Sequence, residues 1–131
     1  PEGIRGAKAT AGAIFLARTG KTKDEIKNYI CEKYYYDLSR TLDEIRKTYH
    51  HVESCQQTVP EAITAFLVGE NFEDVARSAV SLSGDSDTLT AIACSIAEGC
   101  YGIPDEITNM ANEKLDEFMR ELIDKWENWR N

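Results

Sequence analysis

The sequence has 131 residues, of which 42% are hydrophobic and 29% are charged, a composition typical of one globular domain. Its formal net charge of -8 disfavours a general binder of nucleic acid or of anionic membranes, and no apolar run reaches the roughly 18 residues of a membrane span. The four cysteines form no Cys-x-x-Cys pair, so we expect neither a zinc site nor a disulfide framework, and we favour a cytoplasmic setting.

Apolar residues recur at helical spacing from the N-terminus onward. The first helix is predicted over residues 3–18, and one of its faces carries Ile4, Ala7, Ala11, Ile14, Phe15 and Arg18. Three more helices are predicted from capping boxes, in which a threonine and a glutamate three residues later bond to each other's backbone amides. These boxes begin at Thr22, Thr41 and Thr58.

Two further helices are predicted in the second half of the chain. Asn71 is expected to cap a helix that starts at Phe72, because its short side chain can accept a bond from a free amide of the first turn. After Pro104 the pattern predicts one long helix whose apolar stripe packs against the outside of the fold. Apolar–polar alternation of strand length is missing, so we predict an all-α fold, a compact multi-helix single domain over residues 1–131.

Two aspartates and a threonine precede a helix that is too apolar to face solvent. They lie in the segment "SGDSDT", whose residues all favour the N-terminal end of a helix. In one interpretation Asp85 and Asp87 only satisfy free amides and complement the helix dipole. One cap needs a single acceptor, however, and Gly84 would let the backbone bend so that both carboxylates converge on a hard cation such as Mg²⁺, with Thr88 adding a hydroxyl. The spacing alone leaves both interpretations open.

Three segments of the chain match the pattern of a known family in its order. They are "PEGIRGAKATAGAIFLARTGKTKDEI", "SCQQTVPEAITAFL" and "SLSGDSDTLTAIACSIAEGCYGIP", and together they cover most of the chain up to Pro104. The second is similar to a Cys-x-x-Thr-Val-Pro segment, and the third to a Gly-Gly-Asp-x-Asp-Thr metal motif. In this combination the chain resembles the ADP-ribosylglycohydrolases, an all-α, Mg²⁺-dependent family that includes the dinitrogenase reductase-activating glycohydrolases.

The resemblance implies a site and a reaction. Asp85, Asp87 and Thr88 would ligate magnesium in a two-metal centre, and Gly84 and Ser86 would contact the substrate. That substrate would be an ADP-ribosylated protein or a small ADP-ribose conjugate, from which hydrolysis of a glycosidic bond releases ADP-ribose. Neither nucleic acid nor a membrane is expected as a partner.

The sequence departs from the family pattern in two ways. Ser83 stands where the motif usually has its first glycine. The Gly-Asp segment, the Thr-Asp-Asp motif and the histidine-bearing turn of the family's N-terminal half have no counterpart, so we expect a C-terminal half that holds half of the metal site and is inactive alone. It would associate with the missing half or form a homo-oligomer. The alternative is a non-catalytic helical interaction module derived from the same fold.

Overall fold

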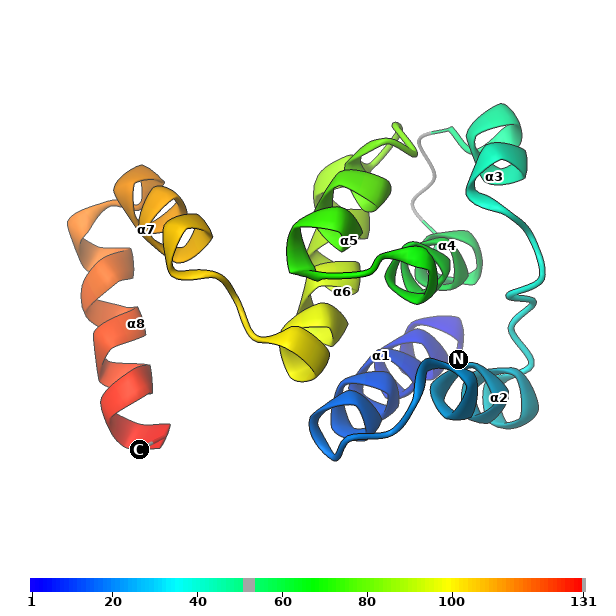
Figure 1. Cartoon of the computed structure of the whole chain (residues 1–131), viewed down its shortest axis with the longest axis horizontal. Helices are drawn as coiled ribbons and strands as arrows, with labels where there is room; N and C mark the ends of the chain where they lie inside the picture. Colours follow the sequence, from blue (N-terminus) through cyan, green and yellow to red (C-terminus); the bar gives the residue numbers. More distant parts are fainter. Residues whose placement is uncertain (51–53, 131) are drawn as a thin grey trace.

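The structure is a computed structural model that describes residues 1–50 and 54–130, and all regular secondary structure in these ranges is helical (Figure 1). The helices in the described ranges are α1 (Glu2–Arg18), α2 (Lys23–Tyr34), α3 (Leu42–Thr48), α4 (Cys55–Val68), α5 (Phe72–Val80), α6 (Ser86–Tyr101), α7 (Asp105–Lys114) and α8 (Glu117–Arg130). The predicted all-α fold is confirmed. None of the helices in the described ranges has the length and apolar character needed to cross a membrane.

Helix α6 is part of the body formed by the first six helices. It packs against α1, α4 and α5, and α4 in turn contacts α1 and α5 (Figure 1). Its buried residues recur at intervals of three and four, the spacing of one helix face. They are Leu89, Ala93, Ile96 and Ala97. Core packing along this face fixes the position of residues 83–88 at the N-terminal end of α6, which we call the acidic turn.

Small residues allow α1 to pack closely against its neighbours. Its buried face consists of Gly6, Ala9, Ala13 and Ala17. A Cβ on Gly6 would lie 3.0 Å from the Cβ of Cys55 on α4, so this contact leaves no room for a larger residue. The predicted face of α1 is wrong, because Ile4 and Phe15 are 64% and 65% exposed. Close approach of two helices requires small side chains, and α1 therefore turns its alanine face inward.

Side-chain caps begin α2, α3 and α5 as predicted. Thr22 and Thr41 form complete capping boxes, and the Oδ1 of Asn71 accepts a 2.9 Å hydrogen bond from the Asp74 amide. The third predicted box is wrong, since α4 already begins at Cys55 and Thr58 is buried inside it. Every residue from 58 to 66 is buried, so core packing rather than a local cap determines where α4 starts.

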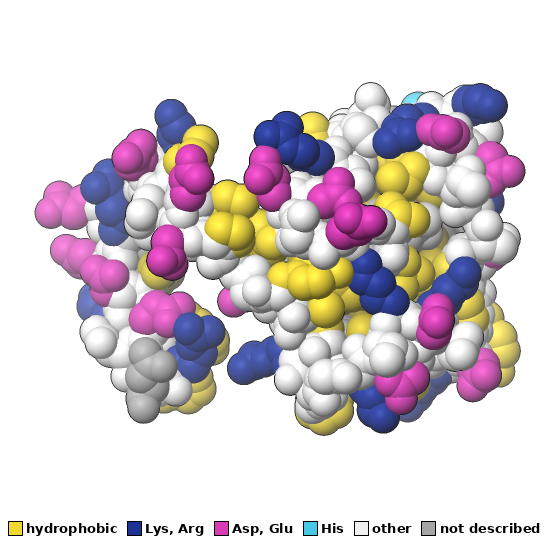
Figure 2. Space-filling model, in the orientation of Figure 1, with side chains coloured by type: hydrophobic (Ala, Val, Ile, Leu, Met, Phe, Trp, Pro, Cys, Tyr) yellow, Lys and Arg dark blue, Asp and Glu magenta, His cyan; other side chains and the backbone are white. Residues whose placement is uncertain are grey.

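The chain after Gly102 forms an arm of two helices instead of the one long helix predicted. Helix α7 ends at Lys114, and the Oδ1 of Asp116 accepts a 2.8 Å hydrogen bond from the Met119 amide at the start of α8. Neither α7 nor α8 has a fully buried residue. Ile107 of α7 is half-buried against the core, but the large apolar residues of α8 are exposed, so the expected packing of the whole stripe is wrong. Figure 2 shows the arm standing apart from the body. Its exposed large apolar side chains are Ile103, Met110, Phe118, Met119, Leu122, Ile123, Trp126 and Trp129.

Candidate metal site

The acidic turn joins α5 to α6 through two left-handed residues. Leu82, only 1% exposed, anchors the end of α5 in the core. Ser83 and Gly84 follow with φ angles of 64° and 62°. Two successive left-handed residues turn the chain sharply, so that Asp85 directly precedes the first turn of α6. The bend predicted at Gly84 is present, and Ser83 shares it.

A close contact also requires glycine at position 84. A Cβ on Gly84 would lie 2.7 Å from the Cε1 of Tyr49 and 3.0 Å from the carbonyl carbon of His50. Both of these residues follow α3 and are distant from the turn in sequence. The turn therefore rests directly on the segment after α3, and any larger residue at position 84 would displace it.

The four residues after Gly84 form the N-cap and the first turn of α6. Asp85 occupies the N-cap position, but its side chain makes no capping hydrogen bond, so a role as a cap does not account for it. Asp85 and Ser86 are half-buried, while Asp87 and Thr88 are exposed. Their side chains offer only oxygen donors, the ligands that Mg²⁺ prefers in proteins. The chemistry of this turn fits one side of a magnesium site.

The acidic turn does not belong to a complete metal-binding cluster within the described residues. Residues 1–50 and 54–130 contain no group of three or more His, Cys, Asp or Glu side chains placed to bind one metal ion. An octahedral Mg²⁺ at this turn would need several waters or further ligands from elsewhere.

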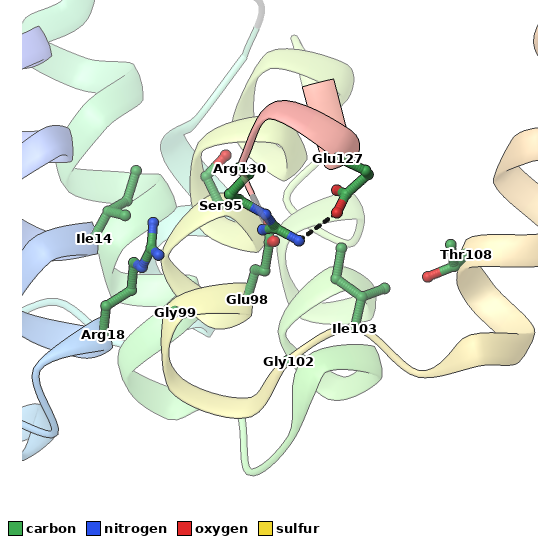
Figure 3. A pocket seen from close by; sticks show the side chains of 10 residues that line it. All are labelled: Ile14, Arg18, Ser95, Glu98, Gly99, Gly102, Ile103, Thr108, Glu127 and Arg130. Atoms are coloured by element: carbon green, nitrogen blue, oxygen red, sulfur yellow. Dashed lines mark hydrogen bonds and ion pairs between the residues drawn. The ribbon is translucent and has the colours of Figure 1, made fainter. Parts of the chain in front are cut away.

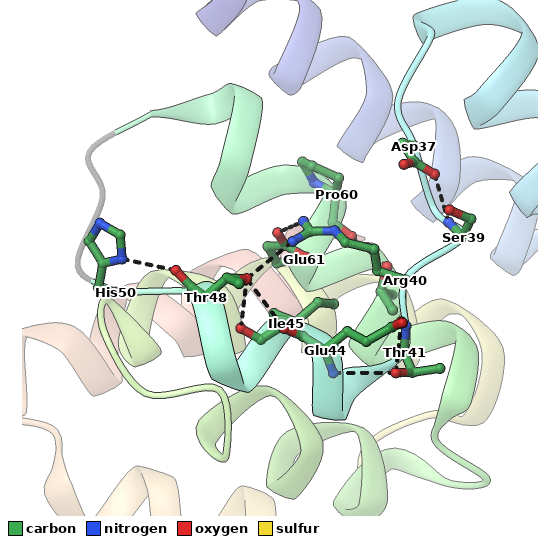
Figure 4. Close-up of polar contacts among 11 residues, drawn as sticks. Asp37, Ser39, Arg40, Thr41, Glu44, Ile45, Thr48, His50, Pro60 and Glu61 are labelled. Atoms are coloured by element: carbon green, nitrogen blue, oxygen red, sulfur yellow. Dashed lines mark hydrogen bonds and ion pairs between the residues drawn. The ribbon is translucent and has the colours of Figure 1, made fainter.

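Sequence reasoning missed a buried acid near the turn. Glu61 on α4 is 3% exposed and forms an ion pair with Arg40 from the loop between α2 and α3 (Figure 4). Burial raises the pKa of Glu61 above its usual 4.5, although the positive charge of Arg40 acts in the opposite direction. A carboxylate within the apolar run of residues 59–63 was a usable signal, but its spacing from Thr58 suggested a capping box instead.

Tyr49 lies close to both the acidic turn and the buried acid. Burial raises the pKa of Tyr49, the negative charges of Asp85 and Glu61 act in the same direction, and the hydroxyl of Thr58 opposes them. Both carboxylates are therefore near enough to act on the same phenol. A pocket of about 170 Å³ adjoins this tyrosine, and its lining consists of Arg40, Thr48, Tyr49, His50, Gln57 and Glu61.

A separate groove lies at the opposite end of α6 (Figure 3). It has a volume of about 560 Å³ and runs between the body and the arm. Its lining includes Arg18 of α1, Glu98 of α6 and the pair formed by Glu127 and Arg130 of α8, whose charged atoms are 2.5 Å apart. A helix of 16 residues, the length of α6, spans roughly 24 Å. The groove is thus remote from Asp85 and does not belong to the same site.

These features define an all-helical protein with an oxygen-rich turn at the N-terminal end of α6. The sequence model of the ADP-ribosylglycohydrolase family matches residues 1–131, and the chain therefore belongs to this family. The corresponding comparisons with curated proteins and with solved structures give no match.

Proposed function

We propose that the protein acts in the Mg²⁺-dependent hydrolysis of the glycosidic bond between ADP-ribose and a protein side chain or a small conjugate. The family match over residues 1–131 carries this proposal. The half-buried Asp85 carboxylate, which makes no cap of its own, supports it. Water would add across the glycosidic bond and release ADP-ribose together with the unmodified acceptor.

The residues of the acidic turn have separate roles in this proposal. Asp85, Asp87 and Thr88 hold the metal, and Gly84 and Ser86 contact the substrate. When bound, Mg²⁺ supplies positive charge that fixes ribose hydroxyls and offsets negative charge developing during bond cleavage. The N-terminal end of α6 lies beside these side chains, and the positive end of a helix dipole suits a ligand that also carries phosphates.

We further propose that the chain supplies only part of the metal site and has no hydrolase activity alone. Its described residues offer no cluster of three metal-binding side chains, and three oxygens from one turn leave much of an octahedral shell to water. The exposed apolar residues of α1 and of the arm support association, either with a polypeptide that carries the remaining ligands or with a second copy.

The release of ADP-ribose from an ADP-ribosylated protein tests both parts of the proposal. The chain is assayed with Mg²⁺ or EDTA, alone and together with the N-terminal half of another family member. We expect no release by the chain alone and Mg²⁺-dependent release by the mixture. The double variant D85N/D87N of the chain should abolish the release by the mixture. D105N with D124N, two exposed acids of the arm, is the matched control and leaves the activity unchanged.

Two results would count against the proposal in different ways. Robust Mg²⁺-dependent release by the chain alone would show that its site is complete. If the mixture stayed active after the combined replacement of Asp85 and Asp87, these two residues would not be the metal ligands.

A further inference from the structure

An ion pair connects the core helix α4 to the end of α3. The guanidinium of Arg40 donates to the buried carboxylate of Glu61, and its Nη1 lies 3.5 Å from the Oγ1 of Thr48, the last residue of α3 (Figure 4). Arg40 therefore lies between the two helices and contacts both.

A second contact holds α3 from the side of α5. The Nε and Nη2 of Arg46 donate to the Oγ of Ser81 at 3.2 and 2.7 Å, and Ser81 lies two residues before the left-handed Ser83. Helix α3 has only seven residues, and so short a helix is marginal without tertiary contacts. Its position is thus determined by its contacts with α4 and α5.

The segment that follows α3 supports the acidic turn. The ring of Tyr49 and the backbone of His50 approach Gly84 so closely that no Cβ would fit between them. The Nδ1 of His50 also lies 2.9 Å from the carbonyl oxygen of Thr48, which holds this segment against the end of α3. A displacement of Tyr49 would consequently move the backbone on which Asp85 is placed.

Stability alone gives little reason for an ion pair at this position. Removing a carboxylate from water costs free energy that its partner only partly offsets, and a well-packed apolar residue in its place is often neutral or stabilising. Glu61 is 3% exposed, and its nearest neighbours along α4, residues 59–60 and 62–63, are apolar. The pair does, however, give the end of α3 one defined position.

We propose that Glu61 and Arg40 are positioning residues for Asp85. Their ion pair fixes the end of α3. Tyr49 follows α3 directly and contacts Gly84, so its position determines the position of the acidic turn. Neither Glu61 nor Arg40 contacts the metal. This inference rests on the proposed metal role of Asp85 and adds two residues, from α4 and from the loop before α3, to the determinants of that site.

Amide NMR of the 131-residue chain during titration with Mg²⁺ tests this inference without an activity assay. The chemical shifts of the amides of residues 85–89 report the Kd for Mg²⁺ at the acidic turn. E61Q keeps the shape of the side chain and removes its charge. We expect it to raise the Kd on the order of tenfold, the size of effect typical of groups that support metal ligands.

Three further variants separate positioning from a general loss of stability. E73Q removes an exposed ion pair with Arg77 on α5, and we expect it to leave the Kd unchanged. Y49F keeps the ring on which Gly84 rests and should bind as the parent does, whereas Y49A should bind more weakly. Circular dichroism confirms that each variant is folded.

The possible outcomes are distinct. Absence of saturable shifts in the parent chain would contradict both the metal role of the turn and the positioning role. Saturable binding with the same Kd in the parent and in E61Q would contradict the positioning role alone. Should E61Q fail to fold, R40K takes its place as the test variant. The Arg40 side chain is 40% exposed, so its replacement is tolerated more easily, and lysine lacks the planar fork that reaches both Glu61 and Thr48. A parental Kd in R40K would also contradict the inference.

Discussion

Ser83 is the residue of the acidic turn in which backbone strain is most evident. It is exposed, and its backbone has a φ of 64° although it is not a glycine. This left-handed conformation costs an L-residue about 1–2 kcal/mol. Strained residues of this kind gather at functional sites, where the surrounding structure holds them in place. Here the buried Leu82 before it and the close contact of Gly84 after it provide that constraint.

We expect S83G to raise the free energy of unfolding by about 0.5 kcal/mol, because the relief of strain exceeds the additional chain entropy of glycine in the unfolded state. The same replacement at Ser78 within α5 should lower it by roughly 0.5–1 kcal/mol, since that position has ordinary helical geometry. Urea unfolding measures both changes. A loss at position 83 equal to that at position 78 would contradict the strain argument.

Helix α8 differs from the helices of the body in the apolar side chains that it exposes. Met119, Leu122, Trp126 and Trp129 follow one another at intervals of three, four and three residues, the spacing of a helix-packing seam. The two tryptophan rings lie 5.1 Å apart and are 56% and 76% exposed. Aromatic residues exposed in a row are typical of surfaces that bind another protein.

Because the arm has no fully buried residue, its removal should leave the body folded. A chain that ends at Pro104 is expected to keep its Tm within about 5 °C of the parent, equivalent to about 1 kcal/mol for a domain of this size, and to associate less at high concentration. Circular dichroism and light scattering measure these two properties. The double variant L122E/W126E of the full chain should reduce association to the same extent without changing the Tm. If the shortened chain were unfolded, the arm would be shown to stabilise the body.

The chain has a net charge of -8, and its carboxylates respond to acid in opposite ways. Backbone hydrogen bonds from Thr22 and Thr41 lower the pKa values of Glu25 and Glu44 below the usual 4.5. Their contribution to stability is present above that value and is lost as the pH falls through the lowered pKa. Burial raises the pKa of Glu61 instead, so protonation of this residue favours the folded state as the pH falls.

We expect the free energy of unfolding to decrease as the pH falls from about 5 to 3. The decrease should be shallower in E44Q, which lacks one acid-sensitive capping box, and steeper in E61Q, which lacks the opposing group. Urea unfolding across this pH range measures the three slopes. E98Q, which replaces an exposed acid outside the capping boxes, is the control, and equal slopes for E44Q and E98Q would contradict this explanation.

Features that depend on neighbours along the chain were predictable from the sequence. The capping boxes at Thr22 and Thr41 and the cap at Asn71 rest on contacts three residues apart, and short-range spacing is sufficient to predict such contacts. The all-α class and the family followed from the same local patterns. The metal role of Asp85 and Asp87 was inferred from the motif and stays a prediction.

The choice of buried surfaces and the support of the acidic turn depend instead on how the helices pack. The inward face of α1 and the start of α4 depend on the space between packed helices, which sequence periodicity does not report. The contact of Gly84 with Tyr49 and the ion pair of Glu61 with Arg40 join residues at least 21 positions apart. Such contacts arise from the packing of whole helices, and therefore no local pattern could predict them.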